Sequence, residues 1–138
     1  MRNEAANLLL SAYAARTQAQ EIPFAVHACL PQLLSVSESD LCVLLSNALE
    51  NAIHAYGQLR EDEAWDGIDV QLYEENGKVF LQIINDCRED VRFEHGIPVT
   101  ARPGHGIGMQ SICTIVERYQ GVSSFSVQNG KFILRISL

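Results

Sequence analysis

Residues 41–57 read LCVLLSNALENAIHAYG and carry two separate stripes at helical spacing. Hydrophobic side chains recur every three or four residues, which predicts a helix with one face buried against a core. They are Leu41, Leu44, Leu45, Ala48, Leu49, Ala52 and Ile53. The second group, here called the asparagine stripe, is Asn47, Asn51 and His54, which lie within about 60° of one another on a helix. Asparagine is a poor helix former, so two of them one turn apart need an explanation.

Magnesium binding is one such explanation. A side-chain amide oxygen is a neutral, hard ligand that can complete the octahedral shell of Mg²⁺ while phosphate oxygens supply the negative charge. The alternative is a polar surface, or asparagines that hydrogen-bond to a neighbouring loop. The asparagine stripe alone leaves both interpretations open, and a second motif is needed to choose between them.

The second motif is GHGIG, Gly104 to Gly108, followed by an amphipathic segment. Alternating glycines let main-chain N–H groups approach an anion, and the helix that follows adds its unsatisfied N–H groups and the positive end of its dipole. Apolar residues at helical spacing predict a helix through Ile112 to Tyr119, with Gly121 as its C-terminal cap. The motif therefore favours a phosphate-binding corner, although glycines before a helix can also mark a plain loop.

Composition limits the classes of protein to consider. The chain has 138 residues, 47% of them hydrophobic, and a formal net charge of −7, which indicates one domain with one core. This acidity argues against an electrostatic nucleic-acid binder. No apolar run approaches the ~18 residues of a membrane span, so we expect a soluble chain. Its four cysteines are widely spaced and lack a C-x-x-C motif, which predicts buried, reduced thiols of a cytosolic protein.

The rest of the chain predicts alternating helices and strands. The expected elements are a helix at 2–20, a strand at 22–30, a helix from 37 to 59, a hairpin of 68–73 with 78–84, and a closing hairpin of 122–128 with 132–138. Each hairpin has Asn-Gly at its turn. Residues 87–103 read as a long polar connection, and a loop of this length is a candidate lid over a ligand.

In order and spacing, the two motifs resemble those of the GHKL ATPase superfamily, which unites gyrase, a class of heat-shock chaperones, histidine kinases and the MutL proteins. NALENA, Asn47 to Ala52, looks like the family's N box, and GHGIG looks like its second glycine box. The resemblance is closest to sensor histidine kinases of the accessory-gene-regulator (AgrC-like), peptide-sensing type. Their phrase D-L-x-x-x-L-x-N-x-L-x-N-A-I is reproduced from Asp40 to Ile53.

This resemblance implies the fold and the ligands. It implies a single domain over residues 1–138, a two-layer α+β sandwich of the Bergerat type, with a mixed, mostly antiparallel sheet backed by three helices. ATP and Mg²⁺ would bind between the asparagine helix and an ATP lid formed by 87–103. Nucleotide contacts would fall on Asn85, Asp86, Gly104, His105, Gly106, Ile107, Gly108 and Met109.

The resemblance also gives the asparagine stripe its roles. Asn51 matches the family's Mg²⁺ ligand. Asn47 matches a position where hydrolysing members carry glutamate as general base, and an amide cannot accept a proton. Asn47 therefore favours phosphoryl transfer to a protein over ATP hydrolysis. His54 matches a position that is often basic and near the phosphates, although a capping or surface histidine fits equally well.

At the adenine end the sequence departs from the family. The first glycine box normally reads D-x-G-x-G after a strand, whereas here VFLQII is followed by NDCRE. Strand alternation places Asn85 at the aspartate position, with Asp86 as a rival contact, and Cys87 and Glu89 replace the glycines. The amide oxygen of Asn85 can still accept a bond from the adenine amine, without the assistance of a charge.

The acceptor of the phosphoryl group is not evident in the chain. The resemblance implies transfer to a histidine on separate dimerisation helices, with a response regulator downstream and no nucleic-acid or direct membrane contact. None of His27, His54, His95 and His105 is placed as that acceptor. We therefore expect a cytoplasmic catalytic domain attached to a membrane-embedded sensor, with residues 1–20 as the possible tail of a connector helix.

Two alternatives remain open at this point. An anti-sigma-factor-type serine kinase of the same superfamily shares the phrase Asn51-Ala52-Ile53-His54-Ala55-Tyr56, but normally has glutamate at the position of Asn47 and an intact first glycine box. A catalytically inactive nucleotide-binding or interaction module is the other alternative, and the altered adenine box favours it.

Overall fold

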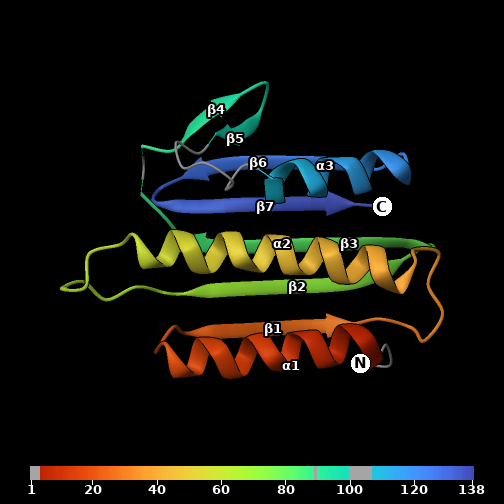
Figure 1. Ribbon diagram of the computed structural model, residues 1–138, viewed down its shortest axis with the longest axis horizontal. Helices are drawn as coiled ribbons and strands as arrows, with labels where there is room; N and C mark the ends of the chain where they lie inside the picture. The colour runs from red at the N-terminus through yellow and green to blue at the C-terminus, as the bar shows by residue number, and fades with distance from the viewer. Residues whose placement is uncertain (1–3, 89, 100–106) are drawn as a thin grey trace.

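The structure, a computed structural model, describes residues 4–88, 90–99 and 107–138. Within these residues, three helices cover one face of a five-stranded sheet, and a separate two-stranded hairpin follows the third strand along the chain (Figure 1). The elements are α1 (Glu4–Ala19), β1 (Phe24–Cys29), α2 (Glu38–Gly57), β2 (Ile68–Glu75), β3 (Lys78–Asp86), β4 (Arg92–Glu94), β5 (Ile97–Val99), α3 (Ile107–Arg118), β6 (Val122–Gln128) and β7 (Lys131–Ser137). The predicted two-layer α+β sandwich is confirmed.

The sheet has the strand order β1-β2-β3-β7-β6, with β1 parallel to β2 and the other neighbours antiparallel. Alternate residues of the central strands, such as Val70, Leu81 and Leu134, are buried and form the core beneath the helices. In Figure 1, α1 lies over β1, α2 over β2 and β3, and α3 over β7 and β6. The opposite face of the sheet carries no helix in the described part of the chain, and its residues are more polar.

Both predicted hairpin turns are confirmed. The residues Asn76-Gly77 and Asn129-Gly130 all have positive φ, between 52° and 81°. Two consecutive residues in this region form the turn that matches the right-handed twist of paired strands, which is why Asn-Gly is favoured there. The sequence signal was sufficient because the turn chemistry is local.

Helix α2 begins and ends close to the predicted residues. Ser37 is its N-cap, and the Ser37 Oγ accepts a hydrogen bond of 3.2 Å from the Asp40 N–H. The helix ends at Gly57, two residues before the predicted end. The whole predicted apolar stripe is buried, so the asparagine stripe on the same helix is held away from the core.

The connection 87–103 is more regular than predicted. It contains a short antiparallel hairpin, β4 with β5, in which Arg92 pairs with Val99. Its turn is His95-Gly96, with φ of 53° and 77°, which is the Asn-Gly geometry with histidine in the first position. Histidine is enriched at positive φ but is a weaker signal than asparagine, so the turn was missed.

The end of α3 also differs from the prediction. Gln120, and not Gly121, is the residue with positive φ, at 53°. The Gly121 N–H donates to the Val116 carbonyl at 2.8 Å and the Gln120 N–H to the Glu117 carbonyl at 2.9 Å, which is a Schellman motif. Glycine is required at 121 for another reason: an added Cβ would lie 2.1 Å from the Ser137 carbonyl oxygen.

The prediction about the cysteines was only partly right. Cys87 is buried, Cys42 and Cys113 are half-buried, and Cys29 is exposed on β1. Burial raises the pKa of the Cys42 and Cys113 thiols, with nearby glutamates adding to the effect.

Among the described residues, no helix combines the length and the apolar character that a membrane crossing requires.

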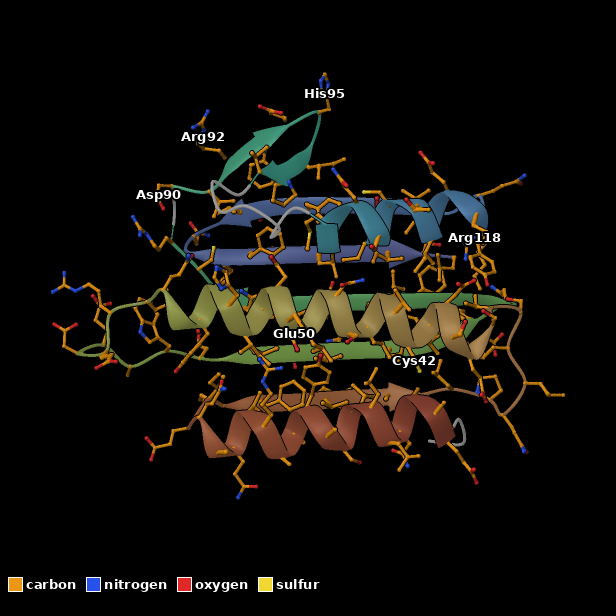
Figure 2. All side chains as sticks on the ribbon, in the orientation of Figure 1. Cys42, Glu50, Asp90, Arg92, His95 and Arg118 are labelled. Carbon is orange, nitrogen blue, oxygen red and sulfur yellow. The ribbon has the colours of Figure 1, made fainter. Side chains whose placement is uncertain are left out.

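A polar cluster joins the beginning of α2 to the end of α3. Asp40 accepts hydrogen bonds from the Tyr119 hydroxyl at 2.5 Å and from the Arg118 guanidinium at 2.6 Å. Figure 2 shows Arg118 at this end of α3, beside the first turns of α2. The Tyr119 hydroxyl, together with Arg118 and Ser37, lowers the pKa of Asp40. The cluster therefore favours the ionised carboxylate in the folded protein.

We expect the stability contributed by this cluster to disappear in acid. A carboxyl whose pKa is lowered on folding stabilises the protein above its unfolded pKa of about 3.9, and that contribution is lost as the pH falls through the lower folded value. Urea unfolding of Asp40→Asn and wild type at pH 7 should show a clear difference, which shrinks below about pH 4. A difference that stays constant down to pH 2.5 would contradict the assignment.

Candidate nucleotide site

The asparagine helix and the described end of the glycine motif meet in the structure. Asn47, Asn51 and His54 of α2 are all half-buried. Gly108, the second residue of α3, lies against Asn47: a Cβ at Gly108 would be 3.4 Å from the Asn47 Oδ1 and 3.8 Å from the Asn47 Cβ. The N-terminus of α3, with its unsatisfied N–H groups, is thus placed beside the side-chain amide of Asn47.

Other predicted contacts lie near this junction or outside the described residues. Ile107 opens α3, and the Met109 side chain is buried in the core, 5% exposed. A buried side chain leaves the backbone of Met109 as the part that can face a ligand. Gly104, His105 and Gly106 lie outside the described residues.

His54 has a partner in Gln58, the C-cap of its own helix. The Gln58 Nε2 amide donates to the His54 Nε2 at 3.2 Å, and this nitrogen can accept only in the neutral tautomer that carries its proton on Nδ1. His54 also belongs to the last turn of α2, where a positive charge interacts favourably with the helix dipole. This geometry accommodates both interpretations of His54, a phosphate neighbour and a helix-end residue.

Asn85 is the buried polar residue at the end of β3. It is 1% exposed and continues the row of Leu81 and Ile83 on the face of the sheet that the helices cover. Its Nδ2 donates to the Asp86 carbonyl at 3.0 Å. The Asn85 Oδ1 is buried and has no hydrogen-bond partner among the described residues. Buried acceptors without a partner are uncommon, so this oxygen is a candidate ligand contact.

Asp86, one residue later, is 3% exposed and has partners for both carboxylate oxygens. Oδ2 accepts from the Gly67 N–H at 2.7 Å, and Oδ1 accepts from the Lys131 ammonium. Lys131 also donates to Asp66 at 2.6 Å. Burial lowers the pKa of Lys131, but the two carboxylates outweigh that effect and the net shift is upward.

The contacts of Asp86 were not predicted from the sequence. Gly67 is far from Asp86 along the chain, and Lys131 reaches it only because β7 pairs with β3, where Lys131 lies opposite Asp86. The one available signal was Lys131 itself, a charged residue next to the Asn-Gly turn of the closing hairpin. Both carboxylate oxygens of Asp86 thus hold the fold together, whereas the Asn85 Oδ1 has no hydrogen-bond partner among the described residues.

The β4–β5 hairpin lies in the predicted lid segment, and in Figure 2 His95 is at its tip. Before it, Arg88 pairs with Asp90 at 2.7 Å, and both side chains are exposed. In the described part of the chain no group of three or more His, Cys, Asp or Glu side chains could hold a metal ion. The Mg²⁺ site predicted from the sequence would not need such a group, because it would use one amide and phosphate oxygens.

Comparison with known proteins gives the class of the domain. The family model of the GHKL domain matches residues 36–138. The chain therefore belongs to the GHKL domain family. A sequence search of curated proteins finds no match.

Solved structures with the same fold include several histidine kinases. The catalytic domain of histidine kinase ThkA, in a nucleotide-free form, aligns with a TM-score of 0.73 and 16% identity over 98% of this chain and 90% of that chain. A mycobacterial sensor histidine kinase, MprB, aligns with a TM-score of 0.63 and 17% identity over 96% and 92%. AdeS, a histidine kinase of Acinetobacter baumannii, aligns with a TM-score of 0.66 and 16% identity over 97% and 62%. These similarities confirm the predicted fold.

Proposed function

We propose that this domain is the catalytic domain of a sensor histidine kinase: it binds Mg²⁺-ATP between α2 and α3 and donates the γ-phosphoryl group to a histidine on a separate segment. The observation that carries the proposal is the contact between Gly108 and Asn47. The first turn of α3, which begins within the glycine motif, lies beside Asn47 of the asparagine stripe. We further propose the accessory-gene-regulator, peptide-sensing subtype, on the phrase Asp40 to Ile53.

The phosphate end of the site works by positioning and charge neutralisation. Bound Mg²⁺-ATP supplies the transferable phosphoryl group and a cation that offsets its charge. Asn51 would hold the metal through its amide oxygen, and the N–H groups at the start of α3 would bind the phosphates. Asn47 cannot take a proton from water, so it does not promote hydrolysis in competition with transfer. His54 adds a positive charge near the phosphates when protonated.

The adenine end depends on the orientation of one amide. Because the Asn85 Nδ2 donates to the Asp86 carbonyl, the Asn85 Oδ1 is fixed as the group that can meet a ligand. An amino group on the purine can donate to this oxygen, whereas the oxo group of guanine would place two acceptors against each other. Reversing the amide would remove its bond to Asp86. We therefore infer a preference for ATP over GTP even without the aspartate of the family.

The remaining parts of the proposal concern the surroundings of the domain. Its partners would be the dimerisation and phosphoacceptor helices of a receptor and a response regulator, on the cytoplasmic side of a membrane-embedded sensor. Residues 87–103 would be the ATP lid. Residues 1–20 would continue from a connector, but burial of Ala6, Leu10 and Tyr13 also makes α1 part of the domain core.

Nucleotide binding to the isolated domain tests the proposal. A fluorescent ATP analogue should bind in a Mg²⁺-dependent manner, and Asn51→Ala should weaken binding in Mg²⁺ by at least about tenfold, because a metal ligand is lost. Asn7→Ala, the same substitution at an exposed position of α1, is the matched control and should bind normally. No binding by the wild type, or equal binding by Asn51→Ala in Mg²⁺, would refute the proposed site.

The type of phosphate bond then separates the candidate activities. With ATP and an added phosphoacceptor helix, a histidine kinase yields an acid-labile phosphohistidine. An acid-stable phosphoserine on an added partner would favour the anti-sigma-factor-type serine kinase. Nucleotide binding with neither product would favour the catalytically inactive module.

A further inference from the structure

A second polar cluster, here called the α1–α2 clamp, joins α1 to the middle of the asparagine helix. It consists of Tyr13 and Arg16 on α1 and of Ser46 and Glu50 on α2. Tyr13 donates to the Glu50 Oε2 at 2.7 Å, and its hydroxyl lies 3.1 Å from the Ser46 Oγ. Both Arg16 terminal nitrogens donate to the Glu50 carboxylate, one of them at 3.0 Å. Neither the core nor the proposed nucleotide contacts account for this cluster.

We propose that Glu50 is a positioning residue for Mg²⁺-ATP, held by Tyr13 and Arg16 so that the amides of Asn47 and Asn51 keep their orientation. This inference rests on the proposed function. Glu50 lies within NALENA, three residues after Asn47 and immediately before Asn51. On a helix it is about 60° from Asn47 and about 100° from Asn51. Because the three residues belong to one helix, any rotation of α2 about its axis moves all three side chains together.

The clamp supplies what the apolar contacts of α2 do not. The buried leucines hold α2 on the sheet, but apolar burial is non-directional and tolerates a small rotation of the helix. Hydrogen bonds have preferred distances and angles, and they weaken when either changes. Figure 2 shows Glu50 on the side of α2 that faces α1. With α1 on that side and Gly108 of α3 against Asn47, the rotation of α2 is limited from both flanks.

The environment of the clamp favours its bonded form. The Glu50 carboxylate accepts from both Arg16 terminal nitrogens and from the Tyr13 hydroxyl, so donors from α1 hold both of its oxygens. Burial raises the pKa of Tyr13, so its hydroxyl keeps the proton that it donates. Tyr13 is 7% exposed and the Glu50 side chain is 48% exposed, so the bond between them is partly shielded from water.

The test compares the affinity for an ATP analogue in Mg²⁺ with that in EDTA, for the wild type, Tyr13→Phe, Glu50→Ala and the double variant. Positioning of Asn51 matters only when the metal is present. Each single variant should therefore reduce the gain in affinity due to Mg²⁺ by roughly three- to tenfold and leave metal-free binding unchanged. The double variant should be close to Glu50→Ala, because the bond between Tyr13 and Glu50 is already lost in that single variant.

Glu38→Ala, at an exposed position in the first turn of the same helix, is the matched control and should bind as the wild type does. Tyr13→Phe keeps the buried ring, so it decides the question if Glu50→Ala fails to fold. Normal Mg²⁺-dependent binding by the wild type with an unchanged gain in Tyr13→Phe would overturn the inference alone. A wild type that binds no nucleotide would overturn the proposed function and this inference with it.

Discussion

Gly67→Ala is expected to lower the free energy of unfolding by more than about 3 kcal/mol, because two independent penalties fall on one position. Gly67 has φ of +94°, a conformation that L side chains rarely adopt. An added Cβ would lie 2.1 Å from the Pro23 carbonyl oxygen. That oxygen accepts the Ile68 N–H at 2.9 Å, so Pro23 cannot retreat without opening the start of the β1–β2 pairing.

Gly77→Ala separates the two penalties. Gly77 also has positive φ, +81°, but nothing lies within 4 Å of its added Cβ. Gly77→Ala should therefore lower the free energy of unfolding only by the cost of backbone strain, about 1–2 kcal/mol. Urea unfolding of both variants at one temperature gives the comparison. Equal losses would mean that the backbone around Pro23 relaxes without cost, contrary to the expected clash.

Asp86→Ala should be the next most damaging change, at about 3 kcal/mol, because it leaves two groups without their partner. The Asp86 side chain is 4% exposed and satisfies the Gly67 N–H and the Lys131 ammonium. A buried N–H that loses its acceptor bears the cost of its desolvation. Lys131 is 30% exposed and keeps Asp66, so its share of the loss is the smaller one.

Two further variants check this account by urea unfolding. Asp66→Ala removes the other partner of Lys131. Because the Asp66 side chain is 87% exposed, this variant should change stability little. Lys131→Met in the Asp86→Ala background should recover part of the loss, because an apolar side chain needs no partner. If Asp66→Ala proves as damaging as Asp86→Ala, the burial of Asp86 is not the origin of its contribution.

Elements whose signals are local were predictable from the sequence. The Asn-Gly turns fixed both long hairpins, and the Ser37 cap with its apolar stripe defined α2. Failures came where the chain used a less typical residue for the same geometry. His95 replaced asparagine in the turn of the β4–β5 hairpin, and Gln120 took the left-handed position expected for Gly121. In the second case tertiary contact explains the glycine, since Gly121 is crowded by Ser137.

The candidate site was predictable as far as its residue types carry chemistry. Asn47 and Gly108 were identified from their motifs, and the structure brings them together. The sequence did not predict that Asp86 has partners for both carboxylate oxygens while the Asn85 Oδ1 has none. Those partners, Gly67 and Lys131, come from distant parts of the chain. The α1–α2 clamp was also missed, because its partners are far apart in the sequence: Tyr13 is 33 residues from Ser46. A charged residue on a helix, such as Glu50, usually predicts a solvent-exposed side chain without a fixed partner.

The parallel pairing of β1 with β2 has a kinetic consequence. Parallel neighbours need a crossover, and here the crossover is α2, the helix that carries Asn47 and Asn51. Strand β1 must find β2 across a long intervening segment, and such non-local pairings form slowly because loop closure comes before their stabilising contacts. The site helix therefore reaches its final place only when this non-local pairing is made. Competence to bind nucleotide should appear late in refolding, after the β2–β3 and β6–β7 hairpins have formed.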